Sequence, residues 1–133
     1  GIMLKFTIKL PPVTKKNSPQ IRFNPKTGKR FVTPSEQYKR YEKAAMLFVP
    51  TDVAAYITEP VEVKALFYMP TRRRVDLTNL LEALDDTLVR AGLLADDNCR
   101  IIVSHDGSRV LYDKAHPRTE VTISRCKGAE TWN

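Results

Sequence analysis

Apolar and polar residues alternate in three segments of this chain, residues 4–10, 61–68 and 119–124. A period of two places successive side chains on opposite faces, which is typical of a β-strand with one buried face. Pro11-Pro12 ends the first segment and Met69-Pro70 ends the second, as expected for residues that interrupt a strand. We therefore predict a strand in each segment.

Two other segments repeat apolar residues at helical spacing. At about 100° per residue, six apolar side chains of residues 77–91 fall within a stripe about 100° wide. They are Leu77, Leu80, Leu81, Leu84, Leu88 and Ala91. Gly92 stands where a left-handed C-cap belongs. A second helix is predicted from a cap at Thr33 or Ser35 to about Val49, where Pro50 ends it.

Turn-forming residues separate these elements. Residues 13–34 contain three prolines and Gly28, which predicts a loop with a short hairpin around residues 25–28. Asp106-Gly107 lies between short apolar runs and predicts a second hairpin, formed by residues 101–103 and 110–112. Residues 127–133 are expected to fray. Separate strands and helices in 133 residues favour a single α+β domain spanning residues 4–126.

The net charge of +7 is concentrated in one segment. Residues 15–43 contain nine basic and two acidic residues, which alone gives +7. This concentration favours a phosphate-binding surface, and an ordinary solvated face is the alternative. The candidates for phosphate contact are Lys15, Lys16, Asn17, Arg22, Lys29 and Arg30, with the run Arg72, Arg73 and Arg74.

Two details qualify this basic surface. Three adjacent arginines cannot all point the same way, so at most two are expected to reach phosphate. Phe23, Phe31 and Tyr38 are interleaved with the cations and could stack on exposed bases, with core packing as the alternative.

Residues 76–97 form an acidic island in which six carboxylates and one basic residue give a charge of −5. Asp76 stands at the helix start, Asp86 lies nearly three turns later on the same face, and Asp96-Asp97 follow the reversal at Gly92. If the chain returns Asp96 or Asp97 to Asp76, these carboxylates could bind one or two Mg²⁺ ions. The alternatives are a helix cap, a turn and a solvated face at Asp85-Asp86.

Other kinds of chemistry are disfavoured. Cys99 and Cys126 form no metal-binding spacing with His105 or His116, and we expect both thiols to be reduced in a cytoplasmic protein. A histidine general base is a minor alternative, because both histidines lie in predicted turns far from the acidic island in sequence. No apolar run approaches the roughly 20 residues needed to span a bilayer.

Taken together, these residues resemble the RusA-type Holliday junction resolvases, small bacterial and phage endonucleases. The most specific part of the resemblance is the spacing D-x-x-N…D…G…D-D. In this chain it consists of Asp76, Asn79, Asp86, Gly92 and Asp96-Asp97. Less specific agreement extends over most of the chain. It comprises Pro11-Pro12, the basic loop with Asn17, the Ser35-Glu36-x-Tyr38 helix start, Met69-Pro70 and residues 72–74.

The resemblance implies an α+β domain, with a mixed β-sheet packed with two main helices. It also implies a Mg²⁺-dependent homodimer, with Mn²⁺ as a substitute, that nicks two opposed strands of a four-way DNA junction in recombination and repair. Asp76 and Asp97 would be catalytic metal ligands, and the adjacent Asp96 would share that role. Asn79 and Asp86 would support the site.

Two positions depart from the family's best-known pattern. Thr78 replaces a third Asp, and Glu82 replaces a Lys that is important for catalysis. One hypothesis is that Glu82 supplies the missing metal ligand, while a cation of the arginine run or Lys114 replaces the lysine. The other is reduced activity or altered substrate choice. Two rivals therefore stay open: a non-catalytic or weakly active junction-binding protein, and a basic interaction module whose acidic helix is only solvated.

Overall fold

The computed structural model describes residues 1–15, 20–33, 35–51, 56–126 and 131–132. Its helices are α1 (Glu36–Ala45) and α2 (Leu77–Arg90), and a 3-10 turn, η1 (Met46–Phe48), follows α1. Its strands are β1 (Ile2–Ile8), β2 (Gln20–Asn24), β3 (Lys29–Thr33), β4 (Val61–Met69), β5 (Ile102–Ser104), β6 (Arg109–Tyr112) and β7 (Arg118–Arg125). Within these residues neither helix has the length and hydropathy that a bilayer crossing requires.

The main sheet is mixed, which confirms the predicted α+β class. Its strand order is β1-β7-β4-β5, and β6 also pairs with β4. The β1–β7 and β7–β4 pairs are antiparallel, whereas β5 and β6 run parallel to β4. Along β4, alternate residues from Val61 to Phe67 are buried, as the sequence period of two predicts.

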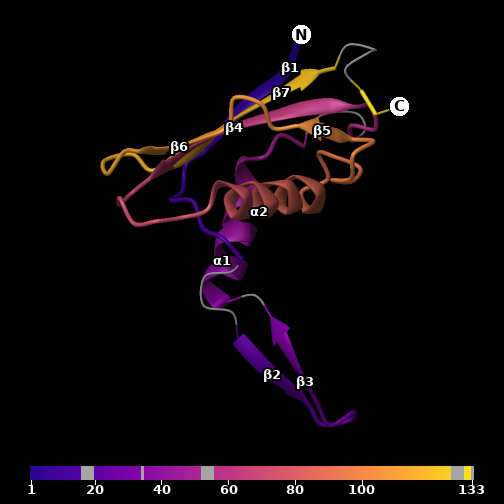
Figure 1. The fold of residues 1–133 in the computed structure, drawn as a ribbon, viewed down its shortest axis with the longest axis vertical. Helices are drawn as coiled ribbons and strands as arrows, with labels where there is room; N and C mark the ends of the chain where they lie inside the picture. The colour runs from indigo at the N-terminus through magenta and orange to yellow at the C-terminus, as the bar shows by residue number, and fades with distance from the viewer. Residues whose placement is uncertain (16–19, 34, 52–55, 127–130, 133) are drawn as a thin grey trace.

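Helix α2 covers one face of this sheet (Figure 1). Leu80, Leu84 and Leu88 are almost fully buried in one core cluster with Val121 and Ile123 of β7. Burial of one such side chain stabilises the fold by about 1.5–3 kcal/mol, so the leucine stripe holds the helix in place. Gly92 follows the helix at a φ of +81°, which confirms the predicted left-handed cap.

The start of α1 settles the choice between two predicted caps. Ser35 adopts an extended conformation, and its side-chain oxygen accepts a hydrogen bond of 3.1 Å from the Tyr38 amide. The α-helix ends at Ala45, earlier than predicted, and continues as η1. Val49 is extended, because a residue before proline is pushed out of the helical region.

The hairpin predicted at Asp106-Gly107 is wrong. β5 and β6 do not pair with each other; both run parallel to β4, one beside its start and one beside its end. Gly107 does form a turn, at a φ of +84°, but the turn only shifts the chain along the same sheet edge. Ser108 bridges the interruption, since its hydroxyl accepts a hydrogen bond of 3.0 Å from the Ala65 amide.

The hairpin predicted around residues 25–28 is confirmed. β2 and β3 pair antiparallel as a separate two-stranded sheet. It projects from the body of the molecule beyond α1 (Figure 1). Lys16 and Asn17, both predicted to contact phosphate, lie outside the described residues, as does most of the predicted frayed tail.

Candidate functional site

A cleft of about 500 Å³ opens at the N-terminus of α2. Its walls come from the loop after β1, the first turn of α1, the end of β4 and the segment that leads into α2. Arg73, Arg74, Asp76 and Asn79 all line this cleft. The cleft therefore joins two cations of the arginine run to the first residues of the acidic island.

Asp76 occupies the N-cap position of α2, but its side chain makes no capping hydrogen bond to the backbone. Its Oδ2 atom instead accepts a hydrogen bond of 3.3 Å from Nδ2 of Asn79. The side chain is exposed, and the first-turn amides of α2 keep their partial positive charge. The simple cap considered as an alternative is thus not what this carboxylate does.

As predicted for three adjacent arginines, the side chains of residues 72–74 do not all reach the same place. The Arg72 guanidinium lies over the Tyr112 ring, 4.3 Å from the ring centroid, and so packs against β6. Arg73 and Arg74 line the cleft beside Asp76. Two exposed guanidinium groups at a helix N-terminus make an environment that attracts anions.

Asp96 and Asp97 lie in the loop after α2, at the other end of the helix. An α-helix of this length spans about 21 Å, at roughly 1.5 Å per residue. The Asp96 side chain accepts a hydrogen bond of 2.7 Å from the Asp97 amide, and both residues are exposed. In the described part of the chain, no three His, Cys, Asp or Glu side chains are grouped closely enough to hold a metal ion.

The structure therefore does not gather the predicted ligands Asp76, Asp96, Asp97 and Glu82 into one group within the described chain. Glu82 is exposed on the helix surface, as is Thr78. The catalytic and metal-binding roles of these carboxylates stay predictions.

The clearest feature that sequence reasoning missed is a contact between Asp85 and His105. Nε2 of His105 lies 2.8 Å from Oδ2 of Asp85, and Nδ1 lies 2.9 Å from the Val63 carbonyl oxygen. Because that carbonyl can only accept, Nδ1 carries a proton and donates it. His105 is far from most of the acidic island in sequence but contacts it in space, and both its ring nitrogens are engaged, which disfavours a role as general base.

Burial and the contact between the two side chains together shift the pKa of each member of this pair. Desolvation raises the pKa of Asp85, and this outweighs the hydrogen bond from His105. Desolvation opposes the charged His105 ring, but the hydrogen bond and charge of Asp85, with the Val63 carbonyl, raise its pKa. One signal was present in the sequence: Asp85 lies beside the leucine stripe of α2, where a carboxylate needs a partner.

Asp86, predicted to support the site, forms an ion pair with Lys15. The Lys15 ammonium also lies 5.9 Å from the centroid of the Tyr38 ring. Tyr38 itself is buried, and its hydroxyl donates a hydrogen bond of 2.8 Å to Glu42. Core packing is therefore the correct alternative for Tyr38, and Lys15 joins the N-terminal loop to α2.

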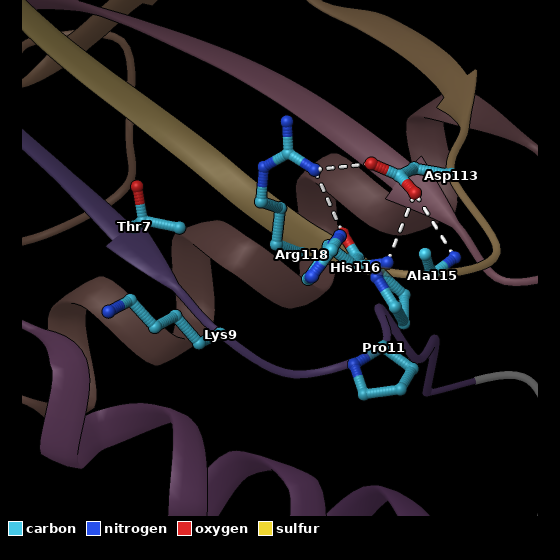
Figure 2. Close-up of a pocket in the computed structure, with 8 residues that line it drawn as sticks. Thr7, Lys9, Pro11, Asp113, Ala115, His116 and Arg118 are labelled. Atoms are coloured by element: carbon cyan, nitrogen blue, oxygen red, sulfur yellow. Dashed lines mark hydrogen bonds and ion pairs between the residues drawn. The ribbon is translucent and has the colours of Figure 1, made fainter.

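A second cleft, of about 770 Å³, lies between β1 and the β6–β7 turn (Figure 2). Arg118 donates to Asp113 and to Glu120 at 2.9 Å each, and its guanidinium lies 3.8 Å from the centroid of the Tyr68 ring. Asp113 accepts from the Ala115 and His116 amides. Asp113 and Glu120 thus balance the positive charge of Arg118, so we assign these contacts a structural role in the turn between β6 and β7.

A family model described as endodeoxyribonuclease RusA matches residues 10–124. The match spans the loop after β1, both helices and the whole cleft at the α2 N-terminus. A comparison with curated proteins finds no match. The chain therefore belongs to the RusA endodeoxyribonuclease family.

Proposed function

We propose that this chain is a structure-selective endonuclease that resolves four-way DNA junctions by metal-dependent hydrolysis of phosphodiester bonds. Family membership supports the nuclease class. The observation that carries the proposal is the cleft at the α2 N-terminus, where Arg73 and Arg74 stand beside the exposed carboxylate of Asp76. Cations and a carboxylate in one cleft suit a phosphate group that is bound together with a divalent ion.

The role of the cations in this proposal is to hold DNA. Arginine binds phosphate through a planar, bidentate fork, and the uncapped amides of α2 add partial positive charge. Of the residues predicted to contact DNA, Lys29, Arg30, Arg73 and Arg74 are exposed. Such contacts carry no sequence information, so selectivity would come from the shape of the DNA.

Asp76 fits a Mg²⁺ ion that is held only partly by protein. Magnesium commonly binds one or two carboxylates together with water and substrate phosphate oxygens. Asp76 offers exposed oxygens, and the only donor to its carboxylate among the described contacts is the side-chain amide of Asn79. A bound Mg²⁺ would polarise the phosphodiester and make a water molecule a better nucleophile. Asp97, Asp96 and Glu82 remain proposed further ligands.

A homodimer is part of the proposal. Cleavage of two opposed strands requires two active sites, and a two-fold dimer places identical sites symmetrically about a junction. A second copy is also one way to bring Asp97 to Asp76, since the two residues precede and follow α2 within one chain. We expect light scattering to give the mass of two chains.

Incubation of an end-labelled four-way junction with the protein in Mg²⁺ or Mn²⁺ tests the proposal. Nicking that needs the ion supports it. Binding without nicking would favour the rival, a junction-binding protein in which Thr78 and Glu82 have weakened the site. The exposed position of Glu82 keeps this rival open.

A further inference from the structure

The β2–β3 hairpin carries large apolar side chains that no core accounts for. Ile21, Phe23, Phe31 and Val32 are all exposed, with 61% of Phe23 and 46% of Phe31 accessible to solvent. Among the described elements, β2 and β3 pack extensively only on each other, and the hairpin projects away from the sheet (Figure 1). Clustered exposed apolar residues of this kind mark an interaction surface.

The charge of the hairpin limits what that surface can bind. Residues 20–33 contain Arg22, Lys26, Lys29 and Arg30 and no acidic residue, which gives +4. The same hairpin of a second copy would meet this charge with equal charge. A polyanion with exposed apolar faces is the complementary partner, and nucleic-acid bases beside phosphates have that chemistry.

The pairing of the strands places an aromatic ring and an arginine together on each face. Phe23 is paired with Arg30, and Phe31 is paired with Arg22. Successive residues of a strand point to opposite faces, so the two rings lie on opposite faces of the hairpin. Arg22 also reaches Glu36 of α1 at 3.3 Å, which ties the hairpin to the body.

The hairpin tip is ordered by its own turn. The Asn24 side chain accepts a hydrogen bond of 2.9 Å from the Lys26 amide, and the Gly28 amide donates to the Asn24 carbonyl at 2.9 Å. Gly28 has a φ of +70°, a conformation that glycine adopts without strain. A two-stranded hairpin has little intrinsic stability, so these bonds help to shape it before it meets a partner.

We propose that the β2–β3 hairpin is a wedge that enters the branch point of the junction, with Phe23 and Phe31 stacking on bases of different arms. This inference rests on the proposed function. When the junction is open, base stacking is interrupted where the arms meet, so base faces are exposed there but not within a duplex. A ring on each face of one hairpin can use two such base faces, while Lys26, Lys29 and Arg30 neutralise nearby phosphates.

Alanine substitution tests the wedge through selectivity. Phe23→Ala and Phe31→Ala are each expected to weaken junction binding roughly 5- to 100-fold, the range for loss of one aromatic–base stack. Binding to a matched duplex should change less than about 2-fold, since a duplex offers no open base face. Phe23→Trp, which keeps an aromatic ring at this position, should bind the junction as wild type does. Leu47→Ala, which removes an exposed apolar side chain from η1, is the matched control and should change neither affinity.

A fluorescent base gives the second readout. With 2-aminopurine beside the branch point, in Ca²⁺ to prevent cleavage, wild-type protein should change the fluorescence, and the double variant Phe23→Ala/Phe31→Ala should not. Equal losses on junction and duplex, or no loss on either, would overturn the wedge. So would a change from dimer to monomer in the variants, which would make the hairpin an interface between copies.

The failure of the wedge is distinguishable from the failure of the proposed function. If wild-type protein cuts junctions but the variants keep full selectivity, only the wedge is wrong. If wild-type protein does not prefer a four-way junction to a duplex, the proposed function fails and the wedge fails with it.

Discussion

Asp76 and Asp85 lie nine residues apart around helix α2, and their surroundings are opposite. Asp76 is exposed in a cleft beside two arginines, and its one hydrogen-bond donor among the described contacts is an amide. Asp85 is largely buried against His105, and its Oδ1 atom has no hydrogen-bond partner in the described structure. Carboxylates of one acidic segment thus divide into those that a neighbouring charged side chain contacts, as His105 contacts Asp85, and those left open to a metal ion.

This difference shows why a count of charges locates a site poorly. Asp86 lies on the same helix and was predicted to support the site, yet it already forms an ion pair with Lys15. The N-terminal end of α2 with Asp76, here its open end, is the candidate for chemistry. The middle of α2 with Asp85 and Asp86, here its partnered middle, is the candidate for stability. Substitutions at the two places should therefore have separate effects, on cleavage in one case and on unfolding in the other.

The largest effect is expected at the open end. Asp76→Asn should lower junction cleavage by at least about 100-fold, because a neutral amide cannot replace an anionic metal ligand. The free energy of unfolding should change little, since the Asp76 side chain makes no cap bond to the backbone. Cleavage and urea denaturation measured on the same preparation check both. Asp106→Asn, at an exposed carboxylate of the β5–β6 turn, is the matched control.

The next effect is expected in the partnered middle. His105→Ala leaves the buried Asp85 carboxylate without its partner and should lower the free energy of unfolding by roughly 2 kcal/mol. This value is below that of a fully enclosed pair, because the ring is partly exposed. His116→Ala removes an exposed histidine and should have little effect. Similar urea midpoints for the two variants would contradict a structural role for the Asp85–His105 pair.

A Glu82→Gln substitution tests whether the proposed metal site at the open end of α2 also includes Glu82, which lies further along the helix. If Glu82 compensates for Thr78 as a metal ligand, the variant should cut junctions about 10-fold more slowly at limiting Mg²⁺, and excess Mg²⁺ should partly restore the rate. Unchanged Mg²⁺-dependent cleavage would remove Glu82 from the site and leave Asp76, Asp96 and Asp97 as its proposed carboxylates.

The pH dependence of stability offers a finer test of the partnered middle. The folded-state pKa values of both His105 and Asp85 are raised, so the folded protein binds more protons than the unfolded chain. The contribution of His105 is therefore present below the usual histidine pKa of about 6.5 and is lost as the pH rises through its raised value. The contribution of Asp85 is lost at lower pH, as the pH rises above the usual carboxyl pKa. Wild type should lose more stability between about pH 6 and pH 8.5 than Asp85→Asn/His105→Gln does.

The smallest effect is expected at Lys15. Its pair with Asp86 is partly exposed, so Lys15→Ala should cost less than about 1 kcal/mol of unfolding free energy. High salt should shrink the difference from wild type, because ions screen such pairs. A larger, salt-insensitive loss would mean that the Lys15 stem packs on Tyr38 more than its charge pairs with Asp86.

Local patterns predicted most of the fold. The leucine stripe of α2, the alternation in β4 and the cap at Ser35 depend on neighbours within a few residues, and all three are present. The Asp106-Gly107 turn was misjudged, because a turn sequence does not reveal whether the strands beside it pair with each other or with β4.

The site was predictable only in part, for a related reason. The family resemblance pointed to Asn79, and because Asp76 and Asn79 are three residues apart at the start of one helix, they do contact each other. The contact between Asp85 and His105 joins residues 20 apart through the packing of the sheet edge on α2, which no local pattern encodes.

A structure of the protein with Mn²⁺ and a four-way junction tests the central claim most directly. We predict that the anomalous signal of the ion lies in the cleft at the α2 N-terminus, in contact with Asp76 and a DNA phosphate, with Arg73 or Arg74 on that phosphate. An ion bound at Asp85 or Asp86 instead, with Asp76 left in solvent, would contradict the assignment of the open end of α2 as the active site.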